Sequence, residues 1–129
     1  MLSKYKCVYY EKYFMSRMGR TLLLAEAPLP VNLIVATSHF ESLGFSANER
    51  KNQLKVTFDL LKMAQNGDEF ANHSVLVGDF NFHSTSKKEE ENLTENGFRD
   101  VMHDFFAASE PTMLKSKKFR AWRPDKVVL

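Results

Sequence analysis

Two apolar segments separated by prolines open the pattern of hydrophobic and polar positions. Residues 20–27 (RTLLLAEA) and 31–40 (VNLIVATSHF) are each predominantly apolar and short, and Pro28 and Pro30 lie in the connection between them. Runs of this length, separated by a short loop that contains proline, are typical of strands. The pattern therefore predicts a β-hairpin over these residues.

The next segment has the period of a helix. Ser46 and Glu49 have the S-x-x-E spacing of a capping box, and Asn66-Gly67 provides the expected end. The apolar positions between them fall on one predicted stripe: Leu54, Phe58 and Leu61, broadened by Val56, Leu60 and Met63. We expect an amphipathic helix from about Ser46 to Asn66.

The rest of the chain continues the alternation of strand and helix patterns. Residues 73–77 have the pattern of a strand, and Gly-Asp-Phe-Asn follows them directly. A loop and a short polar helix are expected over residues 84–97, and a last strand over residues 126–129. An order of β-β-α-β-α-β is typical of a layered α/β protein. We expect one partial domain over residues 1–129.

Composition restricts the class of protein only mildly. The 129 residues are 43% hydrophobic and 26% charged, which favours a folded domain over disorder. The net charge of +2 is too small to indicate a nucleic-acid partner. Cys7 is the only cysteine, so no intrachain disulfide can form and an intracellular location is expected. The most apolar stretch is interrupted by Glu26 and two prolines, so no membrane partner is expected.

Polar side chains follow three of the expected strands. His39 ends one, Asp79 and Asn81 follow another, and Asp125 precedes the last. Strand ends in α/β proteins are where ligands usually bind. Hydrolysis of a phosphodiester needs an aimed water and donors on the phosphate oxygens. Asp79 could activate the water with Asn81 as its partner, and His39 could donate to phosphate while an acid such as Asp125 holds it. A divalent cation normally shares this work.

Each residue also has a structural interpretation, which the residues alone leave open. Asp79 and Asn81 could form an Asx turn after Gly78. His39 could be a surface histidine and Ser42 a loop hydroxyl. Asp125 could pair with Arg123 or Lys126, the basic residues beside it in the sequence.

Five motifs in order resemble one family. They are TSHFES, NERKNQL, VLVGDFNF, GFRDV and RPDKVVL, and the similarity runs from about Met18 to Leu129. Together they resemble the endonuclease/exonuclease/phosphatase superfamily, and the first two resemble its tyrosyl-DNA phosphodiesterase 2 branch. The resemblance implies a partial two-sheet α/β sandwich with outer helices. It also implies magnesium-dependent hydrolysis of 5′-phosphotyrosyl bonds at DNA ends during DNA repair, in the nucleus or also the cytoplasm.

The resemblance also implies roles for particular residues. The expected catalytic residues are His39, Asp79, Asn81 and Asp125. The expected substrate contacts are Glu41, Ser42, His83 and Trp122. The cofactor would be Mg²⁺, with Mn²⁺ as an alternative.

Two motifs of the family have no counterpart in this chain. The family's metal-binding Glu lies on an earlier strand, and its closing Ser-Asp-His lies beyond the last one; neither is found here. The main metal ligand is therefore expected outside this chain. We expect a fragment of an active parent, with weak or no activity alone.

Two other functions remain as alternatives. One is another phosphodiesterase of the superfamily: an abasic-site nuclease, a deadenylase-like RNase or a lipid phosphodiesterase. The other is a non-catalytic nucleic-acid-binding module, because a basic run surrounds two aromatic residues. This run consists of Lys115, Lys117, Lys118, Phe119, Arg120, Trp122 and Arg123. A solvated loop with a buried Trp122 is its structural interpretation.

Overall fold

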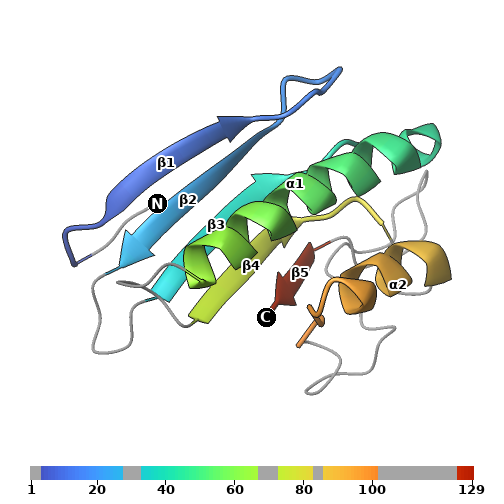
Figure 1. The fold of residues 1–129 in the computed structure, drawn as a ribbon. Coiled ribbons are helices and arrows are strands. Elements are labelled where there is room, and N and C mark those ends of the chain that lie inside the picture. Colours follow the sequence, from blue (N-terminus) through green and yellow to red (C-terminus); the bar gives the residue numbers. More distant parts are fainter. Residues whose placement is uncertain (1–3, 28–32, 67–72, 83–85, 102–124) are drawn as a thin grey trace.

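The computed structural model describes residues 4–27, 33–66, 73–82, 86–101 and 125–129. Five strands form a single mixed sheet in the order β1-β2-β3-β4-β5 (Figure 1). Their bounds are Val8–Tyr13 for β1, Thr21–Ala27 for β2, Leu33–His39 for β3, His73–Asp79 for β4 and Asp125–Val128 for β5. The expected α/β class is confirmed. The expected two-sheet sandwich is not seen, because the described residues build one sheet.

The connections explain the directions of the strands. Strands β1, β2 and β3 are antiparallel neighbours, so the predicted hairpin of β2 and β3 is confirmed. Strand β4 runs parallel to β3, which requires a crossover. Helix α1 (Ala47–Gln65) supplies that crossover, preceded by a short 3₁₀ helix over Gly44–Ser46. Strand β5 is antiparallel to β4. As a result, the ends of β3 and β4 and the start of β5 lie next to one another in the sheet.

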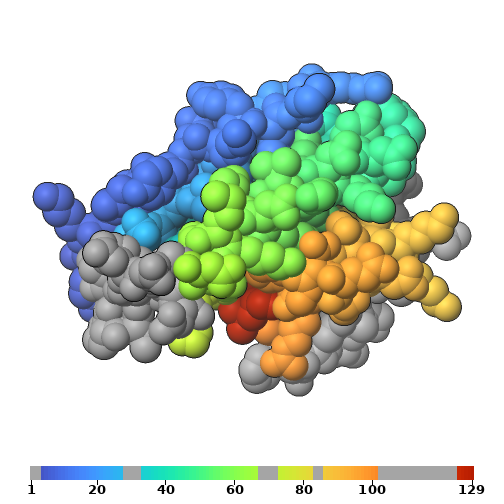
Figure 2. Space-filling view, in the orientation of Figure 1, coloured from blue at the N-terminus to red at the C-terminus, as the bar shows by residue number. Residues whose placement is uncertain are grey.

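Two helices cover the same face of the sheet. Helix α1 lies over its middle, and helix α2 (Lys87–Glu95) lies beside α1 near β5 (Figures 1 and 2). Leu54, Phe58 and Leu61 of α1 are buried in the core, as predicted. Val56 and Met63 were expected to broaden this stripe, and that expectation is wrong because both side chains are exposed. The other buried residues of α1 are polar: Arg50, Gln53 and Thr57.

The ends of the helices are only partly as predicted. Ser46 precedes α1 but makes no side-chain capping bond, and the Glu49 carboxylate instead lies 3.2 Å from Arg17 Nη2. Gly97 follows the end of helix α2, and its φ of 80° favours glycine. The N–H groups of Gly97 and Phe98 there donate to the carbonyls of Thr94 and Leu93. This is a Schellman motif, and its partners Leu93 and Phe98 both lie in the core.

The described part of the chain contains no helix that is both long enough and apolar enough to cross a membrane.

Candidate active site

Three of the expected catalytic residues lie in one row across three neighbouring strands. His39 of β3 is opposite Asp79 of β4 in the parallel register, and Asp79 is opposite Asp125 of β5 in the antiparallel register. Residues in such register project from the same face of a sheet. The sheet therefore brings one imidazole and two carboxylates together from segments 40 to 86 residues apart.

His39 and Asp79 face each other across a gap. His39 Nε2 is 3.7 Å from Asp79 Oδ2, which is longer than a hydrogen bond. The two side chains are 52% and 30% exposed, so both remain accessible to a ligand. The residues that follow them, Phe40 and Phe80, are fully buried with their ring centroids 5.0 Å apart. These two rings anchor the strand ends beneath the polar pair.

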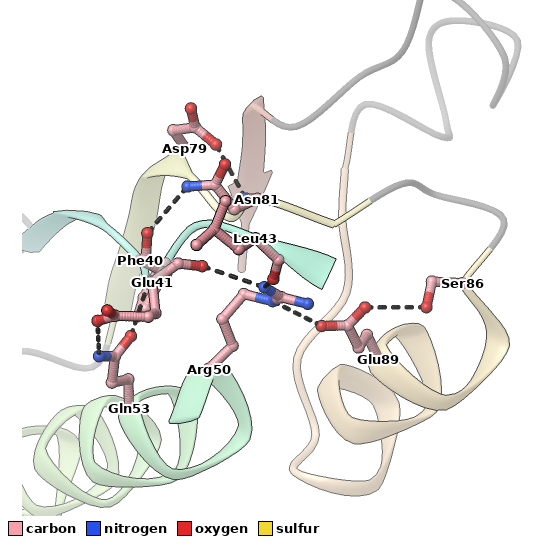
Figure 3. Close-up of polar contacts among 9 residues, drawn as sticks. All are labelled: Phe40, Glu41, Leu43, Arg50, Gln53, Asp79, Asn81, Ser86 and Glu89. Atoms are coloured by element: carbon pink, nitrogen blue, oxygen red, sulfur yellow. Dashed lines mark hydrogen bonds and ion pairs between the residues drawn. The ribbon is translucent and has the colours of Figure 1, made fainter. Parts of the chain in front are cut away.

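Asn81 fixes the loop after β4 through its backbone and its side chain. Its backbone N–H donates to Asp79 Oδ1 over 2.8 Å, and its side-chain Nδ2 donates to the Phe40 carbonyl over 2.9 Å (Figure 3). The sequence left open a contact of the Asn81 amide side chain with the Asp79 carboxylate and an Asx turn; the backbone bond is that of the Asx turn, and the amide side chain bonds Phe40 instead. The turn therefore holds one carboxylate oxygen of Asp79, and the other oxygen is the one nearest His39.

Gly78 allows β4 to approach β3 closely before this turn. A Cβ atom at Gly78 would lie 2.1 Å from the backbone oxygen of Ser38, and the φ of Gly78 is 155°. No side chain fits at that distance. The glycine that precedes Asp79 in the sequence is therefore explained by the close approach of the two strands.

The sequence left open whether Asp125 pairs with a neighbouring basic residue. Lys126 projects to the opposite side of β5, where its Nζ lies 2.6 Å from Glu90 Oε1 and 3.4 Å from Asp100 Oδ2. Asp125 itself is exposed and opposite Asp79. The interpretation of Asp125 as the partner of Lys126 is therefore wrong, while Arg123 lies outside the described residues.

Ser42 has a partner that the sequence did not indicate. Arg20 Nη2 donates to Ser42 Oγ over 3.0 Å, and Arg20 Nε is buried without a hydrogen-bond partner in the part of the chain that the structure describes. The sequence around Arg20 (MGRT) gives no indication of this contact, because Arg20 and Ser42 are 22 positions apart. Arg20 therefore adds a positive charge to the loop that follows His39.

Glu41 was expected to contact substrate, but in the structure its carboxylate is buried and bonded to other side chains of the chain. Its side chain is buried, Ser16 Oγ donates to Glu41 Oε2 over 2.5 Å, and Gln53 Nε2 donates to the same oxygen over 3.2 Å. Burial alone would raise the pKa of Glu41. The hydrogen bonds from Ser16, Gln53 and the Met18 backbone, together with the charge of Arg20, outweigh burial and lower that pKa. Glu41 therefore holds the loop as a buried, ionised group.

Arg50 fastens the same loop to both helices. Its Nη1 donates to the carbonyls of Glu41 and Leu43 over 3.1 and 2.7 Å, and its Nε lies 2.7 Å from Glu89 Oε1 of α2 (Figure 3). Leu43 has a φ of 77°, an unusual value for leucine, and its carbonyl is one of these acceptors. Arg50 and Gln53 are thus supporting residues that helical periodicity alone would have assigned to the surface.

The described side chains do not form a metal site by themselves. No group of three or more His, Cys, Asp or Glu side chains within the described ranges is placed to hold an ion. Two expected substrate contacts, His83 and Trp122, lie outside the described residues, as does the basic run around Trp122.

Known proteins are similar to this chain in structure and not in overall sequence. No protein-family model matches the sequence, and no curated protein sequence matches it. Solved structures do match it. TDP2 from D. rerio, in complex with a single-strand DNA product, aligns over 95% of this chain and 52% of its own, with a TM-score of 0.71 and 20% identity.

Other solved structures have different names and the same architecture. The catalytic domain of human Nocturnin with bound sulfate aligns over 95% of this chain and 47% of its own, with a TM-score of 0.69 and 14% identity. A mannosyl-6-phosphatase from Bacteroides thetaiotaomicron aligns over 94% and 51%, with a TM-score of 0.70 and 12% identity.

The chain spans about half the length of each of these structures. At these identities the likeness is one of fold. The described part of the chain therefore has a partial endonuclease/exonuclease/phosphatase fold, similar to that of TDP2.

Proposed function

We propose that this chain carries part of the active site of a magnesium-dependent phosphodiesterase that hydrolyses 5′-phosphotyrosyl bonds at DNA ends. The observation that carries the proposal is the row formed by His39, Asp79 and Asp125, with Asn81 fixing the turn beside it. An acid whose orientation is fixed, beside an accessible imidazole, suits attack of water on a phosphate ester.

The reaction divides the roles among these side chains. Asp79 Oδ2 orients a water and takes its proton as the water oxygen forms a bond to phosphorus. The bond from phosphorus to the tyrosine oxygen then breaks. His39, when protonated, donates to a phosphate oxygen as negative charge develops there. The leaving group is a phenolate, whose conjugate acid has a pKa of about 10, so it leaves more readily than a sugar alkoxide.

The proposed reaction also includes a metal ion. A bound Mg²⁺, or Mn²⁺ as the alternative, would stabilise charge on the phosphate oxygens. The described residues supply no three-ligand group, so its main ligand would lie outside them. The steps assigned to Asp79 and His39 do not depend on where that ligand is.

The comparison structures support a phosphate ester as the class of substrate. One matched TDP2 structure contains a single-strand DNA product, which supports a DNA end as the partner. Such a role in DNA repair corresponds to the nucleus, with the cytoplasm as the alternative. Because the matched structures include Nocturnin and a mannosyl-6-phosphatase, a different phosphate ester is the second candidate.

Asp79→Asn in the whole protein tests the proposal, with a 5′-phosphotyrosyl oligonucleotide and Mg²⁺. Asparagine keeps an oxygen for the Asn81 N–H but cannot take a proton, so turnover should fall by about 10²-fold or more. Asp59→Asn is the matched control, because Asp59 is exposed on α1 and pairs only with Lys55 among the described residues. Equal turnover of Asp79→Asn and wild type would end the assignment.

A substrate panel separates the first candidate from the second. It consists of the phosphotyrosyl oligonucleotide, an abasic-site duplex, a poly(A) strand, a phosphoinositide and a sugar phosphate. We expect the highest kcat/KM on the phosphotyrosyl end. Higher kcat/KM on another member, lost in the same Asp79→Asn variant, would retain the site and change the substrate.

A further inference from the structure

A buried lysine lies directly behind Asp125, the β5 member of the row of expected catalytic residues. Lys126 follows Asp125 in β5, so the two side chains project from opposite faces of the sheet. The Lys126 side chain is 0% exposed, and lysine is rarely buried to that extent unless its charge is paired. Two carboxylates provide that pairing: Glu90 Oε1 of α2 lies 2.6 Å from Lys126 Nζ, and Asp100 Oδ2 lies 3.4 Å from it.

The same ammonium group also contacts the loop that follows β4. Lys126 Nζ lies 4.6 Å from the centroid of the Phe82 ring, a distance at which an aromatic ring attracts a cation. Phe82 is buried in the core and directly follows Asn81, whose backbone N–H holds the Asp79 carboxylate. Lys126 therefore connects the start of β5 both to α2 and to the turn that orients Asp79.

The end of β5 has a second set of backbone contacts. On the edge away from β4, Val127 and Leu129 make hydrogen bonds of 2.9 to 3.1 Å with residues 99–101. These bonds hold the last part of the strand, whereas the side chain of Lys126 acts nearer its start.

The start of β5 is also where two acids meet. Asp125 lies opposite Asp79 in the sheet register, and carboxylates directly opposite each other repel when both are ionised. That repulsion pushes the start of β5 away from β4. The contact of Lys126 with Phe82, on the chain that continues β4, opposes this displacement.

Stability alone does not account for a lysine at this position. Apolar residues of similar volume often replace a buried ion pair without loss of stability, so the core does not require the charge. An ammonium group held by two carboxylates and a ring instead specifies one position of the strand that carries it. Reactive groups must be held within about 0.5 Å of their productive geometry, and the residue beside Lys126 in β5 is one of the expected reactive groups.

We infer that Lys126 is a positioning residue, which fixes the place of Asp125 relative to Asp79 in the proposed reaction. Because Glu90 and Asp100 pair with the charge of Lys126, its effect on the row is exerted through position and not through charge. The inference rests on the proposed function, because it assigns Lys126 a part in that reaction.

The test is a double-mutant cycle in the whole protein, with kcat and KM measured per folded molecule on the 5′-phosphotyrosyl oligonucleotide. Lys126→Met should lower kcat about 10-fold with KM within about 2-fold of wild type, because a displaced reactive group slows the reaction. In the Asp125→Asn background, the same change should lower kcat by less than about 2-fold, because the group that Lys126 positions is already disabled.

Glu90→Gln is a milder variant, because it weakens one contact of the buried ammonium group and keeps the lysine. It should lower kcat about 3-fold in wild type and have no further effect in the Asp125→Asn background. Glu91→Gln is the matched control and should retain wild-type kcat, because Glu91 is exposed on the same helix. Leu61→Ala, a change in the buried core, controls for stability: it should reduce the amount of folded protein and keep kcat per folded molecule.

Amide hydrogen exchange, followed by NMR, tests the positioning without turnover. In Lys126→Met, exchange of the amides of residues 125–127 should accelerate about 10-fold more than exchange of the β2 amides, because the start of β5 opens locally. A change that only destabilises the whole fold would accelerate exchange in both strands alike.

Three results would overturn the inference. They are wild-type kcat in Lys126→Met, an equal loss of kcat in both backgrounds, and β5 exchange that accelerates no more than β2 exchange. Failure of the proposed function gives a different result, namely full turnover in Asp79→Asn. In that case the exchange measurement still decides whether Lys126 fixes the start of β5.

Discussion

His39 and Glu41 are two residues apart, yet the fold uses them in opposite ways. The His39 side chain is about half exposed, and its nearest carboxylate oxygen is 3.7 Å away. Glu41 is 1% exposed and accepts hydrogen bonds of 2.5 and 3.2 Å from two side chains. His39 has no close partner at the end of the sheet, whereas Glu41 is buried beneath it and bonded to two side chains.

The difference shows how a strand end can carry chemistry. A group that reacts with a ligand must keep unused hydrogen-bonding capacity, so it contributes little to stability. A buried charge must have all its partners, because removing it from water is unfavourable. The network of Glu41, Gln53 and Arg50 therefore holds the loop in place, while His39 and Asp79 remain available for a substrate. Changes beneath the loop should alter stability, and changes at the row should alter rate.

The largest loss of stability is expected for Arg50→Met. Methionine retains much of the apolar stem but removes the ion pair to Glu89 and two bonds to loop carbonyls. Breaking a buried pair from one side costs about 3–5 kcal/mol. Urea unfolding measures the change. Lys55→Met removes an exposed pair with Asp59 and should change the unfolding free energy by less than about 1 kcal/mol. Similar losses in both variants would contradict a special role for Arg50.

The next largest loss is expected for Gly78→Ala. The new Cβ would lie 2.1 Å from the Ser38 oxygen, so β3 and β4 must separate. We expect a loss of about 3 kcal/mol by urea unfolding. Gly44→Ala is the control, because nothing lies within 4 Å of its Cβ and its φ is not positive. That change should be neutral or stabilising, by up to about 1 kcal/mol. A neutral Gly78→Ala would show that the two strands lie farther apart.

A smaller and pH-dependent loss is expected for Glu41→Gln. The pKa of Glu41 is lowered in the folded state, so its ionised form stabilises the fold above the ordinary carboxyl pKa of about 4.3. That contribution disappears as the pH falls through the lower, folded pKa. At pH 7 the variant should lose about 1–2 kcal/mol, from the weakened bonds to Ser16 and Gln53.

The acid part of this prediction is measured by urea unfolding from pH 7 to pH 2. The difference between wild type and Glu41→Gln should shrink towards low pH. A difference that is constant over the whole range would mean that Glu41 is not ionised in the fold.

The smallest effect is expected for Met63→Ser. The side chain is 72% exposed on α1 and lies outside the core. The change should therefore alter the unfolding free energy by less than about 0.5 kcal/mol. Leu61→Ala, two residues away and fully buried, should lose about 2–5 kcal/mol in the same assay. Comparable losses would place Met63 in the core, as its apolar character alone suggested.

The elements of the fold were largely predictable from local pattern. The apolar runs of β2, β3 and β4 and the stripe of Leu54, Phe58 and Leu61 gave the right types of element. Patterning was wrong where polar residues are buried, since Gln53 and Arg50 resemble surface positions until their partners are known. Those partners are Glu41 and Glu89, which are 12 and 39 residues away.

The site was predictable as a list of residues and not as a set of contacts. Strand ends marked His39, Asp79 and Asp125, and the sheet register does bring them together. The contact between Asp79 and the Asn81 backbone N–H is the Asx turn that the local sequence offered as the structural interpretation, so the sequence indicated this bond without deciding between it and an amide side-chain contact. Likewise, a glutamate in a polar loop is expected at the surface, and only the packing of α1 against the loop reveals that Glu41 is buried.

The most direct test of the account compares two measurements on one variant, His39→Ala in the whole protein. One measurement is kcat/KM on a 5′-phosphotyrosyl oligonucleotide, and the other is the unfolding free energy in urea. Because His39 is half exposed and makes no close bond to Asp79, we predict a rate loss of about 10²-fold and a stability change below about 0.5 kcal/mol. Unchanged turnover, or a rate loss explained by an equal loss of folded protein, would contradict the account.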